Sequence, residues 1–229
     1  SQCVEDGAAA IRVHRVAPGD AAVTAQLAAL LVDAFYGRHR ALNGPIAWVQ
    51  RQVLEADVCN ELGSRLRYYE RAREQCLPHI GAVLAATTAD GVLCGFLDIG
   101  RPKYSTAKGF RLPSHPSGGS TTVEESGEHE QELRAYVSNL AVGSESRRRG
   151  IGRLLMQECE LEVRQWLPAQ DYIWLEVSDS NSAAVSFYGS LGYERVGHTS
   201  GREIVKRQFS YTPELVQRGL LRKPLTHGG

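Results

Sequence analysis

A short stretch in the second half of the chain combines arginines and glycines in a pattern that suits a phosphate group. It reads Arg147-Arg148-Arg149-Gly150-Ile151-Gly152 and leads into a run with helical periodicity. The first turn of a helix offers free N–H groups and the positive end of the dipole. Glycines let the backbone approach a bulky anion, and arginines add charge for phosphate oxygens. We therefore expect a pyrophosphate here, with a plain solvated charge run as the alternative.

Two familiar phosphate loops do not fit this stretch. The dinucleotide fingerprint needs a third glycine three residues after Gly152, where the chain has Leu155. The Walker A loop needs Gly-Lys-Ser/Thr, which does not occur in the chain.

A second group of polar residues lies between Glu176 and Tyr188. Glu176 is near the end of an apolar strand, where a carboxylate is partly desolvated and suited to act as a base. Asn181 can cap the helix that follows. The Tyr188 phenol is protonated at neutral pH and can donate a proton to a leaving group. The alternatives are an outward-facing glutamate, a plain cap and a core tyrosine, and Glu130 or Glu132 could supply the base instead.

Hydrophobic periodicity predicts the elements that position these residues. Strands are expected at 11–16, 82–86, 92–99, 135–142, 172–177, 193–196 and 203–209. Helices are expected at 21–35, from Pro45 to about Tyr69 with a break at Gly63, at 151–166 and at 182–190. The helix after the arginines has an apolar face and a polar face, the latter formed by Arg153, Gln157, Glu160 and Arg164. This order of elements is typical of an α/β fold with a mixed sheet covered by helices.

The chain divides into a short N-terminal extension (1–10), one domain (11–210) and a C-terminal tail (211–229). Residues 101–130 lack any period and contain a Pro/Gly/Ser-rich segment and an acidic run, which predicts a flexible insertion. The length of 229 residues suits one core.

Composition narrows the class of protein. The formal net charge is zero, so contact with nucleic acid or an anionic membrane must be local. No apolar run is long enough for a membrane helix. Five cysteines without CxxC pairing disfavour a disulfide scaffold or a metal site and indicate a reducing compartment.

The pattern Arg-x-x-Gly-x-Gly between a strand and a helix resembles the acetyl-CoA loop of the GNAT superfamily of N-acetyltransferases. The strand Asn139-Leu140-Ala141-Val142 resembles that family's splayed strand, and the stretch from Trp174 to Tyr193 resembles its second motif block. The resemblance implies a mostly antiparallel sheet with a splayed central strand. It also implies acetyl-CoA as cosubstrate and no metal, with Glu176 as base and Tyr188 as acid. The implied cofactor-binding residues are Leu140, Ala141, Val142, Arg147, Arg148, Arg149, Gly150, Ile151, Gly152, Arg153, Asn181 and Tyr188.

The acceptor amine is suggested only by finer resemblances. The Glu/Tyr pair is similar to bacterial acetyltransferases of ribosomal-protein N-termini, and the strand 135–142 with the long loop before it resembles plastid enzymes that acetylate N-termini and lysines. These imply protein N-terminal α-amines as acceptors, lysine side chains as a second target, and a chloroplast location, with a cytoplasmic one otherwise. Acceptor-groove residues are expected near Phe35 and Tyr36 and at 197–202.

Ribosome contact is a further expectation, through the basic segments 65–67, 71–73 and 222–223, for which plain solvated surfaces are the alternative. A small-amine acetyltransferase and a CoA-binding docking module stay open as other functions. The sequence gives no oligomeric state.

Overall fold

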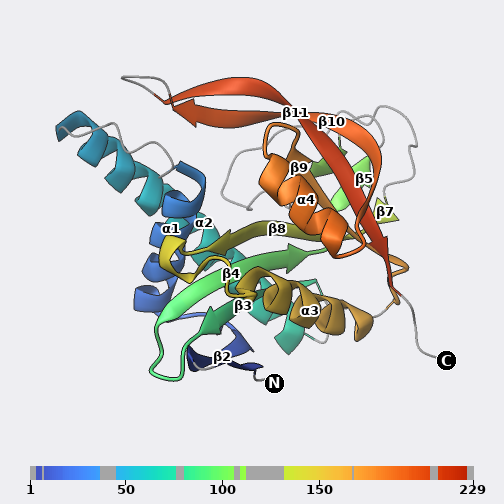
Figure 1. Cartoon of the computed structure of the whole chain (residues 1–229), viewed down its shortest axis with the longest axis horizontal. Coiled ribbons are helices and arrows are strands. Elements are labelled where there is room, and N and C mark those ends of the chain that lie inside the picture. Colours follow the sequence, from blue (N-terminus) through green and yellow to red (C-terminus); the bar gives the residue numbers. More distant parts are fainter. Residues whose placement is uncertain are drawn as a thin grey trace.

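An eight-stranded sheet forms the centre of the protein (Figure 1). The computed structural model describes residues 4–6, 8–36, 45–75, 80–105, 109–111, 132–166, 168–206 and 211–225. The strand order is β1-β2-β3-β4-β8-β9-β11-β10, and all neighbours are antiparallel except β8 and β9. The strands are β1 (Val4–Asp6), β2 (Ala8–Arg15), β3 (Gly81–Thr87), β4 (Leu93–Gly100), β8 (Ala135–Val142), β9 (Tyr172–Ser178), β10 (Glu194–Lys206) and β11 (Tyr211–Pro224). The predicted mixed, mostly antiparallel sheet is confirmed.

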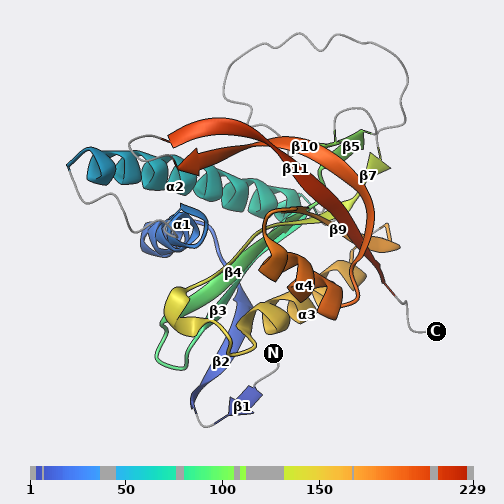
Figure 2. The ribbon, with the colours of Figure 1, turned by 45° about the horizontal axis from the view of Figure 1, so that its top comes forward.

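Two helices cover each face of the sheet (Figure 2). On one face, α1 (Ala21–Tyr36) and α2 (Pro45–Glu74) pack against alternate residues of the central strands, including Val83 and Phe96. On the other face, α3 (Ile151–Arg164) and α4 (Ser182–Ser190) cover the intervening residues, including Leu84, Leu97 and Leu175. The strands buried on both faces account for the apolar runs of the sequence.

The helix α2 is continuous, so the predicted break at Gly63 is wrong. A Cβ atom at Gly63 would lie 3.4 Å from Arg67 Nη1 and 3.7 Å from Thr24 Cγ2 on α1. The glycine therefore sits close to the neighbouring helix, and the packing of α1 on α2 outweighs its poor helix propensity.

The central strands β8 and β9 separate after a short parallel pairing. Their register joins only three residue pairs and ends at Val137 and Leu175, although β8 continues to Val142. On its other side, β8 pairs with β4 through a bulge between Phe96 and Asp98. Asn139, in the bulge, has a φ angle of 55°. A bulge re-aims a strand, so β8 diverges from β9 as the predicted splayed strand does.

The C-terminal segment is a long strand, so the tail predicted for 211–229 is wrong up to residue 224. The strand β11 pairs with β9 on one side and with β10 on the other. The predicted strands 193–196 and 203–209 are one strand, β10, whose ladder with β11 continues through Gly197 and Gly201. The predicted extension 1–10 contains β1 and the start of β2.

The predicted insertion begins with a small second sheet. Its strands are β5 (Lys103–Ser105), β6 (Gly109–Arg111) and β7 (Glu132–Leu133), in the order β6-β5-β7. Residues 112–131 lie outside the described part of the chain, and the predicted flexibility falls mainly on them.

A buried carboxylate joins α2 to the sheet. Asp98 on β4 is fully buried and pairs with Arg65 of α2. It also accepts hydrogen bonds from the hydroxyl groups of Tyr69, at 2.9 Å, and Ser138, at 3.3 Å. Ser138 precedes the bulge residue Asn139, so the contact anchors β8 where it begins to diverge.

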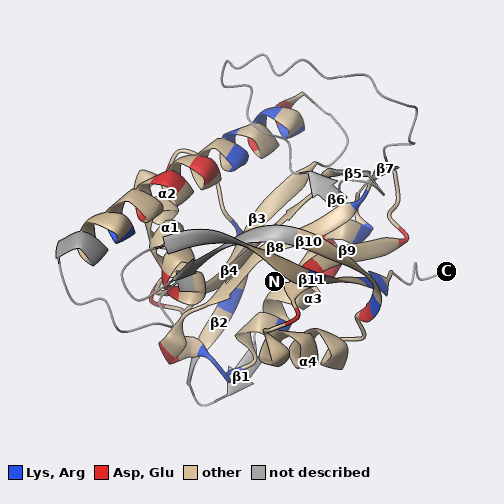
Figure 3. Cartoon of the chain, turned by 90° about the horizontal axis from the view of Figure 1, so that it is seen from above, with Lys and Arg blue, Asp and Glu red and all other residues tan. Residues whose placement is uncertain are grey.

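Acidic and basic residues are interspersed along α2 (Figure 3). Arg65 pairs with Asp98 and Glu61, and Arg73 pairs with Glu70.

No helix within the described ranges is long and apolar enough to cross a membrane.

Candidate active site

The loop between β8 and α3 has the backbone geometry of an anion-binding turn. Arg148 and Gly150 have positive φ angles of 65° and 78°. Gly150 is the N-cap of α3, and because it has no side chain it cannot cap the N–H groups of the first turn. The first hydrogen bond of the helix runs from the Leu154 N–H to the Gly150 carbonyl, at 3.0 Å. The N–H groups of residues 151–153 therefore lie ahead of it and are available to an anion, in the nest expected for a pyrophosphate.

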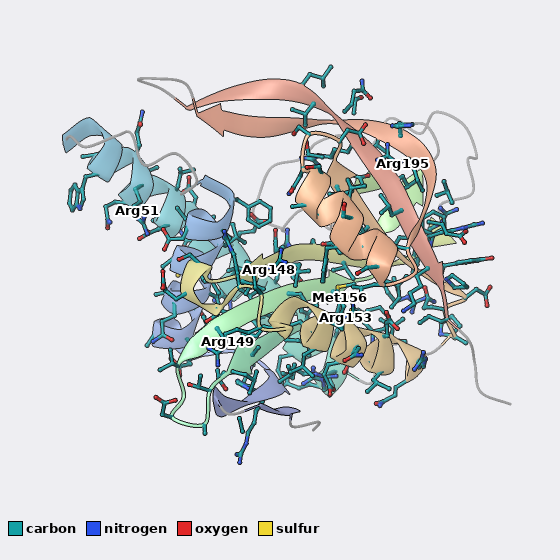
Figure 4. All side chains as sticks on the ribbon, in the orientation of Figure 1. Arg51, Arg148, Arg149, Arg153, Met156 and Arg195 are labelled. Carbon is teal, nitrogen blue, oxygen red and sulfur yellow. The ribbon has the colours of Figure 1, made fainter. Side chains whose placement is uncertain are left out.

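Four arginines surround this turn. Arg148 and Arg149 are exposed on the loop, and Arg153 is exposed on the first turn of α3 (Figure 4). Arg147 turns back onto its own loop, where its Nε donates to the Val142 carbonyl at 3.1 Å. Arg153 Nη2 donates a hydrogen bond to the serine hydroxyl group at the last residue of α4, at 3.2 Å. Arg147 thus closes the loop, whereas Arg148 and Arg149 direct their charge into solvent.

Close packing between α3 and α4 fixes the second glycine of the motif. A Cβ atom at Gly152 would lie 3.2 Å from the Phe187 ring, so a larger residue would push the two helices apart. Asn181 is the N-cap of α4, and its Oδ1 accepts a hydrogen bond from the Ala184 N–H at 3.2 Å. The capping role expected for Asn181 is therefore present, and its binding to a cofactor stays a prediction.

The other cofactor-binding candidates form the end of β8 and the start of α3. Ala141 and Ile151 are buried in the core, and Leu140 and Val142 are half-buried. Among the described strands, β8 has no partner on the β9 side beyond Val137. Backbone groups of residues 138–141 that face away from β4 are therefore available for strand-like pairing with an extended ligand.

Glu176 lies at the point where β8 and β9 separate. It is the first residue of β9 after the last pair, Val137 with Leu175. Leu175 and Val177 belong to the core under α3, so the Glu176 side chain points to the opposite face of the sheet. Its side chain is 11% exposed, and Oε2 lies 3.6 Å from Nη1 of Arg218 on β11.

A buried tyrosine phenol on β8 lies within electrostatic range of both proposed catalytic residues. Tyr136 of β8 is 9% exposed and packs with Trp174 and Leu220. Burial is the main cause that raises the pKa of its phenol, and the charge of Glu176 and the neighbouring Tyr188 act in the same direction. The positive charge of Arg218 and a backbone hydrogen bond at Glu176 oppose the rise. These interactions place Glu176, Arg218 and Tyr188 within electrostatic range of the Tyr136 phenol, and the four residues form one electrostatic cluster.

Tyr188 reaches this cluster from α4. Its ring packs edge-on to Tyr193, with centroids 5.8 Å apart, and against Phe187 at 5.2 Å. Burial is the main cause that raises the pKa of the Tyr188 phenol. The phenol therefore stays protonated at neutral pH, as a proton donor to a leaving group must be.

Sequence reasoning missed two members of the cluster, Tyr136 and Arg218. Tyr136 could have been found from the sequence, because it is an aromatic residue with a hydroxyl group on a predicted strand, two residues before Ser138. Arg218 gave no signal, because its segment was interpreted as a tail. Of the alternative bases, Glu132 begins β7 of the second sheet, and Glu130 lies outside the described residues.

The expected acceptor groove is described only in part. Phe35 is 55% exposed at the end of α1. Residues 197–200 belong to β10, where His198 lies 3.3 Å from the Asp179 carboxylate. For Tyr36, Gly201 and Arg202 the structure describes the backbone alone.

Comparison with known proteins decides the family. The model of the acetyltransferase (GNAT) family matches residues 52–193, more than half of the chain. The chain belongs to the GNAT family. Both the family and the GNAT fold predicted from the sequence are confirmed, and with them an acetyltransferase that uses acetyl-CoA as acetyl donor.

A curated relative is the [ribosomal protein bS18]-alanine N-acetyltransferase of Salmonella typhimurium. It is 43% identical over 61 residues, which span 26% of this chain and 38% of the relative. The match thus covers well under half of that relative's length.

Solved structures agree on the fold. A ribosomal-protein-alanine N-acetyltransferase from Brucella melitensis has a TM-score of 0.52 at 18% identity, covering 93% of this chain and 99% of that one. A spermidine N-acetyltransferase from Vibrio cholerae, solved with CoA and spermine, has a TM-score of 0.53 at 12% identity, covering 94% and 95%. Identities this low support the fold and leave the acceptor open.

Proposed function

We propose that this chain transfers the acetyl group of acetyl-CoA to α-amines at protein N-termini, and to lysine ε-amines as a second class of acceptor. The observation that carries the proposal is the cluster at the divergence of β8 and β9. There, Glu176 on β9 and Tyr188 on α4 both lie within electrostatic range of the Tyr136 phenol. The partial match to a ribosomal-protein N-terminal acetyltransferase supports the choice of acceptor.

Each step of the reaction has a residue suited to it. The acceptor arrives as an ammonium ion, and Glu176 takes its proton, directly or through a water molecule. The neutral amine nitrogen attacks the thioester carbonyl carbon, so that a C–N bond forms, the nitrogen releases its second proton to solvent, and the C–S bond breaks. Tyr188 gives its proton to the departing thiolate of CoA. Binding of the pyrophosphate at the 147–153 loop and of the pantetheine arm along β8 would hold the thioester near this cluster.

A polyamine or other small amine is a weaker candidate acceptor. An acceptor with two or more cationic centres requires an excess of carboxylates around the site. Within the described residues, Glu176 has Arg218 beside it and Asp98 has Arg65. A docking module without catalysis is disfavoured because a base candidate and an acid candidate lie in one cluster.

Location and ribosome contact stay predictions of the sequence. Among the basic segments, Arg65 is held by Asp98, and Lys223 is held by Glu160 at 2.7 Å. Arg222 lies 4.3 Å over the Tyr172 ring. Arg73 pairs with Glu70 at 2.9 Å, so Arg67 and Arg71 are the remaining exposed groups for an encounter with rRNA phosphates.

Two variants test the roles of the proposed base and acid. We expect Glu176→Gln and Tyr188→Phe each to lower kcat for an N-terminal peptide by roughly 10²-fold or more, with the affinity for CoA unchanged. Matched controls are Glu194→Gln and Tyr68→Phe, which change exposed residues on β10 and α2. Unchanged turnover in both active-site variants would refute the assignment.

A further inference from the structure

Ser138 lies at the point where β8 changes direction. In the ladder with β4, Ser138 is opposite Asp98, and the next regular pair is Ala141 with Phe96. Two residues of β8 therefore oppose one residue of β4 between these pairs, which is the arrangement of a bulge. On the other side of β8, the pairing with β9 ends at Val137. Ser138 is thus the last regular residue of β8 before the bulge and the first one beyond the β9 ladder.

The buried carboxylate of Asp98 binds this point of β8 from the neighbouring strand. Asp98 is fully buried and accepts a hydrogen bond from the Ser138 hydroxyl group at 3.3 Å. Two groups of α2 donate to the same carboxylate, the Arg65 guanidinium and the Tyr69 hydroxyl group, the latter at 2.9 Å. Because a buried carboxylate requires such donors, its position is narrowly defined. Ser138 is therefore linked through Asp98 to α2 as well as to β4.

Two glycines make room for the Tyr69 ring. Gly81 on β3 and Gly100 on β4 are opposite each other in the sheet register. A Cβ atom at Gly81 would lie 2.6 Å from Tyr69 Cζ, and one at Gly100 would lie 3.0 Å from the Tyr69 hydroxyl oxygen. The ring therefore occupies space that a larger residue on either strand would fill. This close fit fixes the position from which the hydroxyl group donates to Asp98.

The residue after Ser138 has a backbone conformation that needs support from its surroundings. Asn139 has a φ angle of 55°, in the left-handed region that is unfavourable for residues with a Cβ atom, although asparagine tolerates it better than most. Such a conformation persists where neighbouring contacts determine it. The contact between Asp98 and Ser138 is immediately next to Asn139. It therefore favours the form of β8 that diverges from β9.

We propose that Asp98 is a positioning residue for the acetyl donor: through Ser138, it keeps β8 in the diverged form that receives the pantetheine arm of CoA. Asp98 is fully buried, so it acts through β8 and not by contact with the donor. The apparent Kd of a ligand rises when its binding-competent conformation is less populated. The inference concerns binding of the donor and applies whichever amine accepts the acetyl group.

The test compares the binding of CoA with that of its nucleotide half, ADP phosphorylated on its ribose, by titration calorimetry. The nucleotide half has the phosphates expected at the 147–153 loop but lacks the pantetheine arm. We expect Ser138→Ala to raise the Kd of CoA roughly fivefold and to leave the Kd of the nucleotide half within about twofold of the wild type. Ser138→Thr keeps the hydroxyl group and should bind CoA as the wild type does.

A matched control removes a serine hydroxyl group elsewhere. Ser64 on α2 accepts a hydrogen bond from Arg67 at 2.8 Å, outside the Asp98 interactions. Ser64→Ala should therefore change neither Kd.

A combined variant tests whether Asp98 acts through Ser138. Asp98→Ala together with Arg65→Met removes both buried charges, which a protein tolerates better than the loss of one partner. This pair should raise the Kd of CoA at least about fivefold. Adding Ser138→Ala should then change the Kd by less than about twofold, because the contact is already absent.

Three results would overturn the role of Asp98. The first is an equal Kd of CoA in Ser138→Ala and Ser64→Ala, and the second is an equal rise for CoA and its nucleotide half. The third is a further rise of roughly fivefold when Ser138→Ala is added to the combined variant. Calorimetry reports the Kd of the folded molecules, so a smaller folded fraction lowers only the stoichiometry. The proposed function is tested separately, since it fails only if no free α-amine is acetylated.

Discussion

The glycine at the start of α3 allows the backbone of the phosphate loop to be tested in isolation. Gly150 has a φ angle of 78°, and a Cβ atom there would have nothing within 4 Å. An alanine would therefore meet no steric obstacle, and its cost would come only from the left-handed backbone conformation. That cost is about 1–2 kcal/mol for a residue with a Cβ atom.

The cost of Gly150→Ala must appear in stability, in CoA binding, or divided between them. If the loop keeps its conformation without ligand, the variant loses about 1–2 kcal/mol of stability, or roughly 2–8 °C in Tm for a domain of this size. If the loop relaxes, CoA has to restore the conformation, and its Kd rises roughly 5- to 30-fold. We expect the sum of the two losses, from thermal unfolding and titration calorimetry, to be close to the backbone cost.

Two control variants separate backbone strain from other effects. Asparagine tolerates the left-handed region better than alanine, so Gly150→Asn should lose less. Gly189 also has open space around it but lies within α4, so Gly189→Ala should be neutral or stabilising. If Gly150→Ala changes neither Tm nor the Kd of CoA, the left-handed geometry inferred for this turn is wrong.

Three further predictions concern the core and the site. Asp98→Asn leaves Arg65 without its buried partner and should lower the free energy of unfolding by about 3 kcal/mol, seen as a fall of roughly 6–12 °C in Tm. The control is Asp57→Asn, which changes an exposed residue of α2. An equal Tm in both variants would contradict the stabilising role of the Asp98 interactions. Gly81→Ala would bring a Cβ atom to 2.4 Å from the Tyr69 ring and 2.6 Å from the Ile99 carbonyl oxygen. We therefore expect the free energy of unfolding, measured by chemical denaturation, to fall by at least ~1–3 kcal/mol. A variant as stable as the wild type would contradict the close packing of Tyr69 on Gly81. Because burial raises the pKa of Tyr188, the proton donor is lost only above the ordinary phenol value of about 10, and kcat/KM should show no falling limb between pH 8 and 10; a fall that Tyr188→Phe abolishes would contradict this.

Local patterns were sufficient for the central part of the fold. The apolar face predicted for the helix after the arginines is buried in α3 from Ile151 to Val163, and α4 has the predicted bounds. Both helices have strong periodicity or a capping residue, which are properties of the sequence within a few residues. The turn that leads into α3 at Gly150 was predictable for the same reason, and phosphate binding there stays a prediction.

The C-terminal strand was not predictable from local patterns, and one error there hid several residues. The strand β11 contains Pro213, Gly219 and several basic residues, which weaken its intrinsic preference for a strand. It is stabilised by ladders with β9 and β10. Without β11, Glu160 was expected on the solvent face of its helix, whereas it is 7% exposed and paired with Lys223. Arg218 was missed for the same reason.

The splay of β8 from β9 also depends on distant contacts. The family resemblance implied it, but the residues that hold it, Asp98 and Ser138, come from two strands and are joined to α2 by Arg65. A buried ion pair between distant residues produces no periodic pattern in the sequence, so local patterns could not predict it.

The most direct test of the central claim is mass spectrometry of a matched pair of peptides incubated with acetyl-CoA. One peptide begins with a free serine and contains no lysine, and the other has the same sequence with its N-terminus already blocked. We predict one added acetyl group on the α-amine of the first peptide and none on the second, with the product reduced at least 10²-fold in Glu176→Gln. No acetylation of the free peptide by a preparation that binds CoA would contradict the account.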